Sequence, residues 1–218
     1  QSFIAMGVIS VLWIVVGFSL AFGESMGGFI GNPMSFFMFQ NVLDGSPWSL
    51  APTIPLVLFA FFQLKFAIIT PALITGTFAE RIRFKAYILF LVLFSLLIYA
   101  PLAHWTWHPD GFLFKWGVLD FAGGTVVHMS AGFAALAASM YLRNKAEKKT
   151  TIAPANIPFV LLGTGLLWFG WFGFNAGSAL SAGTLAASAF ATTNTAAAAA
   201  GLLADLVGGR LPAILTSP

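Results

Sequence analysis

The chain has 218 residues, of which 59% are hydrophobic and only 8% are charged, whereas a soluble domain carries about 25% charged residues. So much apolar surface exceeds what a soluble core buries, and we infer that lipid is the solvent for much of the chain. The lack of cysteine in the sequence excludes disulfides, thiolate metal sites and cysteine nucleophiles, and no basic face with interleaved aromatic residues supports nucleic-acid binding.

Six apolar segments follow one another along the sequence, and their lengths predict membrane-spanning helices, which need about 20 apolar residues. Uninterrupted apolar runs favour helices over a β-barrel, whose strands alternate in polarity. The predicted spans are about 3–22, 52–78, 86–103, 121–142, 157–180 and 185–206. The sequence therefore predicts an all-α, polytopic transmembrane helical bundle that forms a single domain over residues 1–218.

Lysine and arginine are distributed unevenly between the predicted loops. If the loops alternate sides, one side carries eight lysine and arginine residues, those of loops 79–85 and 143–156 together with Arg210. The other side carries only Lys115. Because positive charge favours the cytoplasmic side, we predict that 79–85 and 143–156 are cytoplasmic and that 23–50 and 104–120 lie outside. The first span starts without an initiator Met or a basic flank, so it does not resemble a signal peptide, and we expect the chain to be a fragment.

The fourth predicted span carries two ionisable residues. Asp120 opens it at the outer end, and His128 follows eight residues later, which at 1.5 Å per helical residue places His128 about 12 Å deeper, near the bilayer midplane. A histidine facing lipid at that depth is costly, so we expect His128 to face a cavity or another helix. Two simpler interpretations stay open: a packed His128 bonded to a neighbouring group, and an Asp120 that caps the helix, which is compatible with attracting cations.

The fifth predicted span carries an aromatic stripe. Trp171, Phe174 and Ser178 lie at i, i+3 and i+7 and so share one helix face. Aromatic ring faces attract cations, and tryptophan does so most strongly. The alternative is an aromatic core in which Ser178 bonds back to the helix backbone.

Aromatic residues also gather in the second span and in the outer loop 104–120. Phe62 and Phe66 lie at i and i+4 on one helix face, and Lys65 lies one position off that face without an evident role. Trp107 lies in the loop, where it has the character of an interface anchor and is also placed to cover a vestibule.

The sequence offers little for catalysis. His104 and His108 are interpreted as ordinary interfacial residues, because no other metal-ligand types cluster near them in the sequence. No P-loop, Gly-x-Ser-x-Gly or metal-ligand cluster can be found in the 218 residues. We therefore expect neither an enzyme nor a bound metal or other cofactor.

Several motifs resemble signatures of the ammonium transporter (Amt/MEP/Rh) family, and of its Amt branch in particular. They occur in the family's order and cover nearly the whole chain. They are 119–128 (LDFAGGTVVH), 170–178 (GWFGFNAGS), 79–84 (AERIRF), 17–23 (GFSLAFG), and the pair 62–63 with Phe66.

The resemblance implies roles for individual residues and an assembly. The implied outer ammonium site consists of Trp107, Phe62, Phe66 and Ser178, with Asp120 in support. The implied gate and pore consist of Phe66, Phe174, Trp171 and His128, the last being one of two paired pore histidines. The family further implies a homotrimer in the cytoplasmic (inner or plasma) membrane, with one pore per subunit, and a PII-type regulatory protein on the cytoplasmic face.

The family fold has eleven spanning helices in two inverted halves, so the resemblance implies a chain that lacks the first helix and the last four. The second pore histidine would then lie outside the chain, and transport would belong to the intact parent. Three functions stay open: ammonium transport for nitrogen uptake, an ammonium sensor with the same fold fused to a signalling domain, and a neutral gas channel of the Rh type. Trp107 and the outer aromatic site favour a charged substrate.

Overall fold

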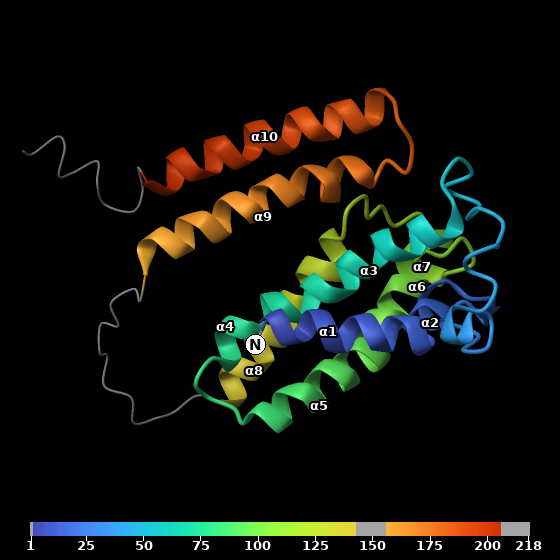
Figure 1. Ribbon diagram of the computed structural model, residues 1–218, viewed down its shortest axis with the longest axis horizontal. Helices are drawn as coiled ribbons and strands as arrows, with labels where there is room; N and C mark the ends of the chain where they lie inside the picture. Colours follow the sequence, from blue (N-terminus) through green and yellow to red (C-terminus); the bar gives the residue numbers. More distant parts are fainter. Residues whose placement is uncertain (1, 143–155, 206–218) are drawn as a thin grey trace, which may run out of the picture. The chain divides into compact units, whose positions relative to one another are not determined.

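The computed structural model describes residues 2–142 and residues 156–205 (Figure 1). The chain divides after residue 148 into two units, and each unit is described here by itself. Within the described ranges the architecture is helical, apart from one short antiparallel hairpin in which β1 (Ser25–Met26) pairs with β2 (Ile30–Gly31). The predicted all-α fold class is therefore confirmed.

The first unit begins with one long apolar helix. It consists of α1 (Ser2–Leu12), the π-helical segment η1 (Trp13–Gly17) and α2 (Phe18–Phe22). The hairpin and a short 3-10 helix, η2 (Phe37–Phe39), follow within the predicted outer loop 23–50. α1 packs against both α3 and α5, which puts the N-terminal helix at the centre of this unit (Figure 1).

Two further helical stretches and a partial one complete the first unit. The second stretch consists of α3 (Leu56–Leu73) and α4 (Thr75–Phe78). The third consists of α5 (Phe84–Phe94), the π-helical segment η3 (Ser95–Tyr99), α6 (Ala100–Trp107) and the short α7 (Phe112–Lys115). The π-helical segment η4 (Gly124–Met129) then leads directly into α8 (Ser130–Tyr141).

The second unit is a pair of helices, α9 (Ile157–Gly177) and α10 (Thr184–Asp205), which lie side by side. The Asn156 side chain accepts a hydrogen bond from the Phe159 N–H at 3.0 Å and so caps the start of α9. Between the two helices, the Asn175 amide donates to the Thr193 hydroxyl at 3.0 Å. A polar contact of this kind holds two helices together where apolar contacts with lipid would be equally favourable.

Aromatic side chains make the core of the first unit. Trp13 is 1% exposed, and its ring lies 5.8 Å from that of Phe18 and 6.3 Å from that of Phe22. Phe22 in turn meets Phe59 of α3 edge to face at 5.1 Å. The buried indole N–H of Trp13 donates to the Ala60 carbonyl at 3.0 Å, so the polar atom of this large residue is satisfied inside the core.

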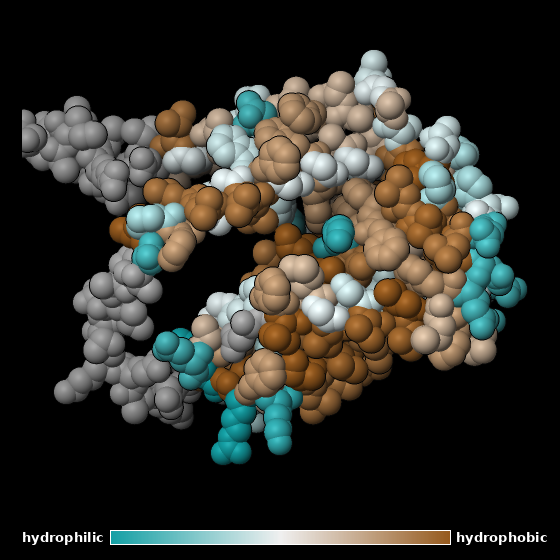
Figure 2. Space-filling view, in the orientation of Figure 1, coloured by the Kyte–Doolittle hydropathy of each residue, from teal (hydrophilic) through white to brown (hydrophobic). Residues whose placement is uncertain are grey.

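Four helical stretches of the described residues are long and apolar enough to cross a membrane, by length and composition. They are Ser2–Phe22, Leu56–Phe78, Phe84–Lys115 and Ile157–Gly177. Figure 2 shows hydrophobic residues along the flank of the first unit and hydrophilic residues gathered towards its ends, as expected where lipid is the solvent. The chain is thus part of a multi-pass integral membrane protein, while its division into six spans and a single domain stays a prediction.

Several predicted helix boundaries differ from the structure, two of them by four residues. The predicted span 52–78 is helical only from Leu56, because Pro55 adopts an extended ψ of 139° and lies outside the helix. The predicted span 86–103 continues to Trp107, so residues 104–107 are helix rather than outer loop. The polar His104 suggested a loop. In the structure its side chain is buried and both ring nitrogens have hydrogen-bond partners, so the helix continues past this residue.

Candidate functional site

Three aromatic residues from two helical stretches meet in the first unit. The rings of Phe62 and Phe66, one turn apart on α3, lie edge to face with centroids 5.0 Å apart. Phe66 also meets Trp107, the last residue of α6, edge to face at 5.5 Å. Phe66 is 1% exposed, whereas the other two side chains are half-buried. We call Phe62, Phe66 and Trp107 the outer aromatic cluster.

Asp120 caps the helix that follows it. Its carboxylate accepts hydrogen bonds of 2.5–2.9 Å from four successive backbone N–H groups, those of Gly123, Gly124, Thr125 and Val126. These N–H groups have no partner within the helix, and negative charge is favoured at this end of the helix dipole. The capping interpretation of Asp120 is therefore what the geometry supports, and a second role in attracting cations is compatible with it.

The cap is joined directly to the outer aromatic cluster. The Trp107 indole N–H donates to the backbone carbonyl of Asp120 at 3.1 Å. Gly123, in the cap, has φ +92°, and a Cβ placed on it would lie 3.6 Å from the Phe66 ring. The outer aromatic cluster and the cap thus form one contiguous assembly.

His128 lies in η4, where its backbone N–H donates to the Gly123 carbonyl at 2.9 Å, and its side chain is exposed in this chain. The predicted offset from Asp120 assumed eight helical residues, and that assumption is wrong. The chain from Asp120 to Gly123 forms the cap, so the helix begins only at Gly124. The four helical steps from Gly124 to His128 correspond to about 6 Å of rise, in place of the predicted rise of about 12 Å over eight residues.

His104 and His108 are not the interfacial residues that we expected. His104 is fully buried and His108 is 7% exposed, and their rings stack with centroids 4.4 Å apart. The sequence did hold a signal for this arrangement, since two histidines at i and i+4 share one face of a helix. We missed it because residues 104–107 were assigned to a loop.

The second unit carries the other predicted site residues. Trp171 and Phe174 stack with ring centroids 5.0 Å apart and planes 22° from parallel. The Ser178 hydroxyl donates to the Phe174 carbonyl at 2.9 Å, which is the bond back to the helix backbone that the simpler interpretation expected. The stripe is thus preformed within α9, and its meeting with the outer aromatic cluster stays a prediction.

Lys65 is exposed on α3 between two members of the outer aromatic cluster, and in residues 2–142 and 156–205 it makes no ion pair. Among these same residues, no group of three or more His, Asp or Glu side chains is placed to hold a metal ion. At the candidate site itself, the cation-attracting features are therefore the ring faces and the carboxylate of Asp120.

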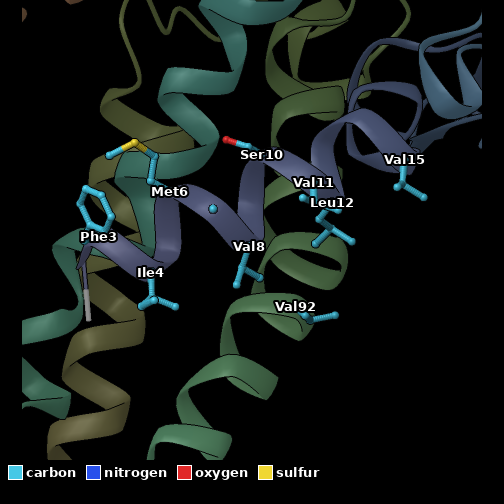
Figure 3. Close-up of a pocket in the computed structure, with 10 residues that line it drawn as sticks. Phe3, Ile4, Met6, Val8, Ser10, Val11, Leu12, Val15 and Val92 are labelled. Atoms are coloured by element: carbon cyan, nitrogen blue, oxygen red, sulfur yellow. The ribbon is translucent and has the colours of Figure 1, made fainter.

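A separate groove of about 890 Å³ follows α1 and η1 (Figure 3). Phe3, Ile4, Met6 and Val11 line it together with Val92 of α5, and Ser10 contributes its hydroxyl. One hydroxyl among apolar side chains offers no adequate replacement for the hydration shell of a cation. The groove has the character of a lipid-facing or helix-packing surface, and we do not include it in the candidate site.

Comparison with known proteins places this arrangement in a family. The putative ammonium transporter of Methanothermobacter thermautotrophicus is 49% identical over 210 residues, which are 96% of this chain and 50% of that protein. The ammonium transporter of Aquifex aeolicus is 48% identical over 202 residues, or 93% of this chain and 46% of that protein. The chain spans about half the length of the curated relatives it matches.

Solved structures give the same result. The crystal structure of Candida albicans Mep2 is similar with a TM-score of 0.86 at 36% identity, over 94% of this chain and 46% of that one. A sensor Amt protein is similar with a TM-score of 0.81 at 35% identity, over 95% of this chain and 53% of that one. The model of the Ammonium Transporter Family matches residues 1–210, and the chain therefore belongs to the ammonium transporter family.

Proposed function

We propose that the intact protein transports ammonium across the cytoplasmic membrane, recruiting the ion at an outer aromatic site and passing it through a hydrophobic pore that contains histidine. One observation carries the proposal: in a member of this family, Phe66 contacts both Phe62 and Trp107, with ring centroids 5.0 and 5.5 Å away. Three rings from two helical stretches make a surface that suits a small cation.

The chemistry of the outer site follows from the cost of removing water from ammonium. Each ring face replaces part of the hydration shell and contributes about 0.5–2 kcal/mol, the larger value applying where water is excluded. The Ser178 hydroxyl oxygen would accept a hydrogen bond from ammonium, and the Asp120 carboxylate would keep the local potential negative. The hydrogen bond of 3.1 Å from the Trp107 indole to the backbone carbonyl of Asp120 supports this assignment, because it ties the ring to the residue that carries the carboxylate.

Deeper steps are assigned to the remaining predicted residues. Phe66 and Phe174 would form the gate, and Trp171 would line the pore beneath it. His128, paired with a second histidine outside this chain, would handle the deprotonated substrate and its proton. The stacking of Trp171 on Phe174 at 5.0 Å supports a rigid aromatic wall at this level. In the intact protein we propose a homotrimer with one such pore per subunit.

The proposed orientation puts loops 79–85 and 143–156 in the cytoplasm and loops 23–50 and 104–120 outside. The argument is the excess of lysine and arginine on one side, and residues 143–155 lie outside the described residues. A PII-type regulator is proposed to dock on the cytoplasmic loops.

An epitope tag inserted between Arg143 and Lys149 tests this orientation. We expect antibody to reach the tag only after the cells are permeabilised, because lysine and arginine near span ends are retained in the cytoplasm. A tag placed near Asp44, in the opposite loop, is the matched control and should be labelled on intact cells. Labelling of the 143–149 tag from outside intact cells would overturn the topology.

The transport proposal is tested with proteoliposomes of the intact protein. After a pulse of ammonium we expect a current that saturates with concentration and that protein-free liposomes do not give. A protein that binds ammonium but carries no current would be a sensor or a neutral gas channel, and the proposed charged pathway would be wrong.

A sensor is the second candidate function, and one observation favours it. The similarity to a sensor Amt protein extends over 95% of this chain, so the fold and the spans are compatible with either role. The two candidates differ in flux rather than in ammonium binding, and the current measurement therefore separates them.

A further inference from the structure

The buried histidine pair lies directly beside the outer aromatic cluster in the sequence. His104 lies in the last turn of α6, which ends at Trp107, and His108 follows directly after the helix. The last carbonyl groups of a helix lack partners within it, so a terminal turn frays unless something else holds it. The position of the Trp107 ring therefore depends on what ties down this turn.

His104 ties it to two other elements. The Ala21 carbonyl of α2 accepts a hydrogen bond of 3.0 Å from His104 Nδ1, and since a carbonyl only accepts, Nδ1 carries the proton. In the neutral ring Nε2 is then an acceptor, and the Ser25 hydroxyl of β1 donates to it at 2.8 Å. The Ser25 oxygen in turn accepts from the Gly28 N–H at 3.1 Å, so the whole outer hairpin joins the contact.

His108 fixes the chain beyond the helix. Its Nδ1 accepts from the Asp110 N–H at 3.0 Å, and its ring meets Trp48 edge to face at 5.2 Å. The backbone of Gly111 packs so closely on the carbonyl of His104 that a side chain on Gly111 would collide with it. The stacked pair is thus held by the outer hairpin, the loop that contains Trp48 and the segment after α6.

We propose that His104, with His108 stacked on it, is a positioning residue for ammonium binding. It holds the last turn of α6 so that Trp107 presents its ring to Phe66, 5.5 Å away, and its indole N–H to Asp120. Neither histidine touches the substrate in this scheme. The inference rests on the proposed function, since it assigns how the outer ammonium site is held.

The test compares ammonium-evoked currents of the intact protein and its variants in proteoliposomes. His104→Ala removes both hydrogen bonds, and we expect its KM for ammonium to rise about tenfold with the maximal current per folded protein unchanged. His104→Asn keeps an N–H donor near the position of Nδ1 and should bring KM back to within about threefold of the parent. If His104 had a merely structural role, its loss would lower the total maximal current by reducing the amount of folded protein, and KM would stay unchanged.

Trp105→Phe is the matched control. It deletes the hydrogen bond of 2.6 Å from the Trp105 indole to the Phe29 carbonyl, which also joins α6 to the outer hairpin, and it keeps an aromatic ring there. We expect the KM of this variant to equal that of the parent. An unchanged KM in His104→Ala, or an equal rise in Trp105→Phe, would overturn the inference. If His104→Ala does not fold, His104→Gln replaces it, since its amide reaches the position of Nε2 and loses the hydrogen bond to the Ala21 carbonyl: a raised KM in folded His104→Gln, with a KM near that of the parent in His104→Asn, supports the inference, and a parental KM in both variants overturns it.

The two levels of the proposal fail in different ways. A parent that carries no ammonium current overturns the proposed function and with it the inference. A parent that conducts, with a KM insensitive to His104, overturns only the positioning role.

Discussion

Replacing Asp120 with alanine in the intact protein is expected to abolish ammonium uptake and to destabilise the fold. The substitution leaves four backbone N–H groups without their acceptor and removes the negative charge beside Trp107. Loss of a helix cap costs about 0.5–2 kcal/mol, and we expect the upper end of this range because Gly123 and Val126, two of the four donors, are buried. We expect uptake below about 1% of the parental rate, which corresponds to a loss of about 3 kcal/mol or more.

Asp110→Asn is the control for this substitution. Asp110 is a second carboxylate of the loop 104–120, exposed and paired with Lys115 at 3.0 Å, and it takes no part in the cap. An exposed ion pair of this kind contributes little to stability, so we expect uptake and melting temperature close to those of the parent. The measurement is uptake of labelled methylammonium, normalised to folded protein. Near-normal uptake by a well-folded Asp120→Ala variant would eliminate a role of this carboxylate in recruiting the ion.

Gly123→Ala is expected to destabilise the protein by about 2–4 kcal/mol, through strain at positive φ and overpacking. Gly123 has φ +92°, a conformation that residues with a side chain rarely adopt. A Cβ there would lie 2.6 Å from Cγ2 of Val127, well inside contact distance. Because the N–H of Gly123 also donates to Asp120, any shift that relieves the clash weakens the cap.

The adjacent glycine gives a close control. A Cβ added to Gly124 would meet no atom of the described residues within 4 Å, and Gly124 begins the helical segment η4. Alanine is the better helix former by about 1 kcal/mol, so Gly124→Ala should be neutral or slightly stabilising. Thermal unfolding of the purified intact protein in detergent measures both variants. Equal melting temperatures for the two would contradict the importance of the left-handed conformation at Gly123.

The fold class was predictable because lipid imposes it. A lipid environment admits only helices and closed barrels, the long apolar runs favour the helix, and the loop composition then marks approximately where each helix ends. The errors occurred where local sequence and tertiary burial disagree. His104 is polar and was assigned to a loop, but its ring finds partners in α2 and in the hairpin, so the helix continues through it.

The candidate site was predictable only in part. Helical spacing places Phe62 beside Phe66, and the structure has these rings in contact. The contact of Phe66 with Trp107 joins different helical stretches and cannot be derived from periodicity. The number of helical residues between Asp120 and His128 was misjudged for a related reason, because the length of the cap after Asp120 depends on backbone conformation at Gly123 rather than on the pattern of apolar residues.

The π-helical segments have a consequence for how such chains vary. In the described residues they occupy Trp13–Gly17, Ser95–Tyr99 and Gly124–Met129. The first two lie within otherwise α-helical stretches, where each accommodates an extra residue, so deletion of one residue there would restore a regular helix and leave the residues on either side on their original faces. We therefore expect gain or loss of one residue to be tolerated at Trp13–Gly17 and at Ser95–Tyr99, whereas a residue lost from the start of the third segment would disrupt the hydrogen bonds that its N–H groups donate to Asp120.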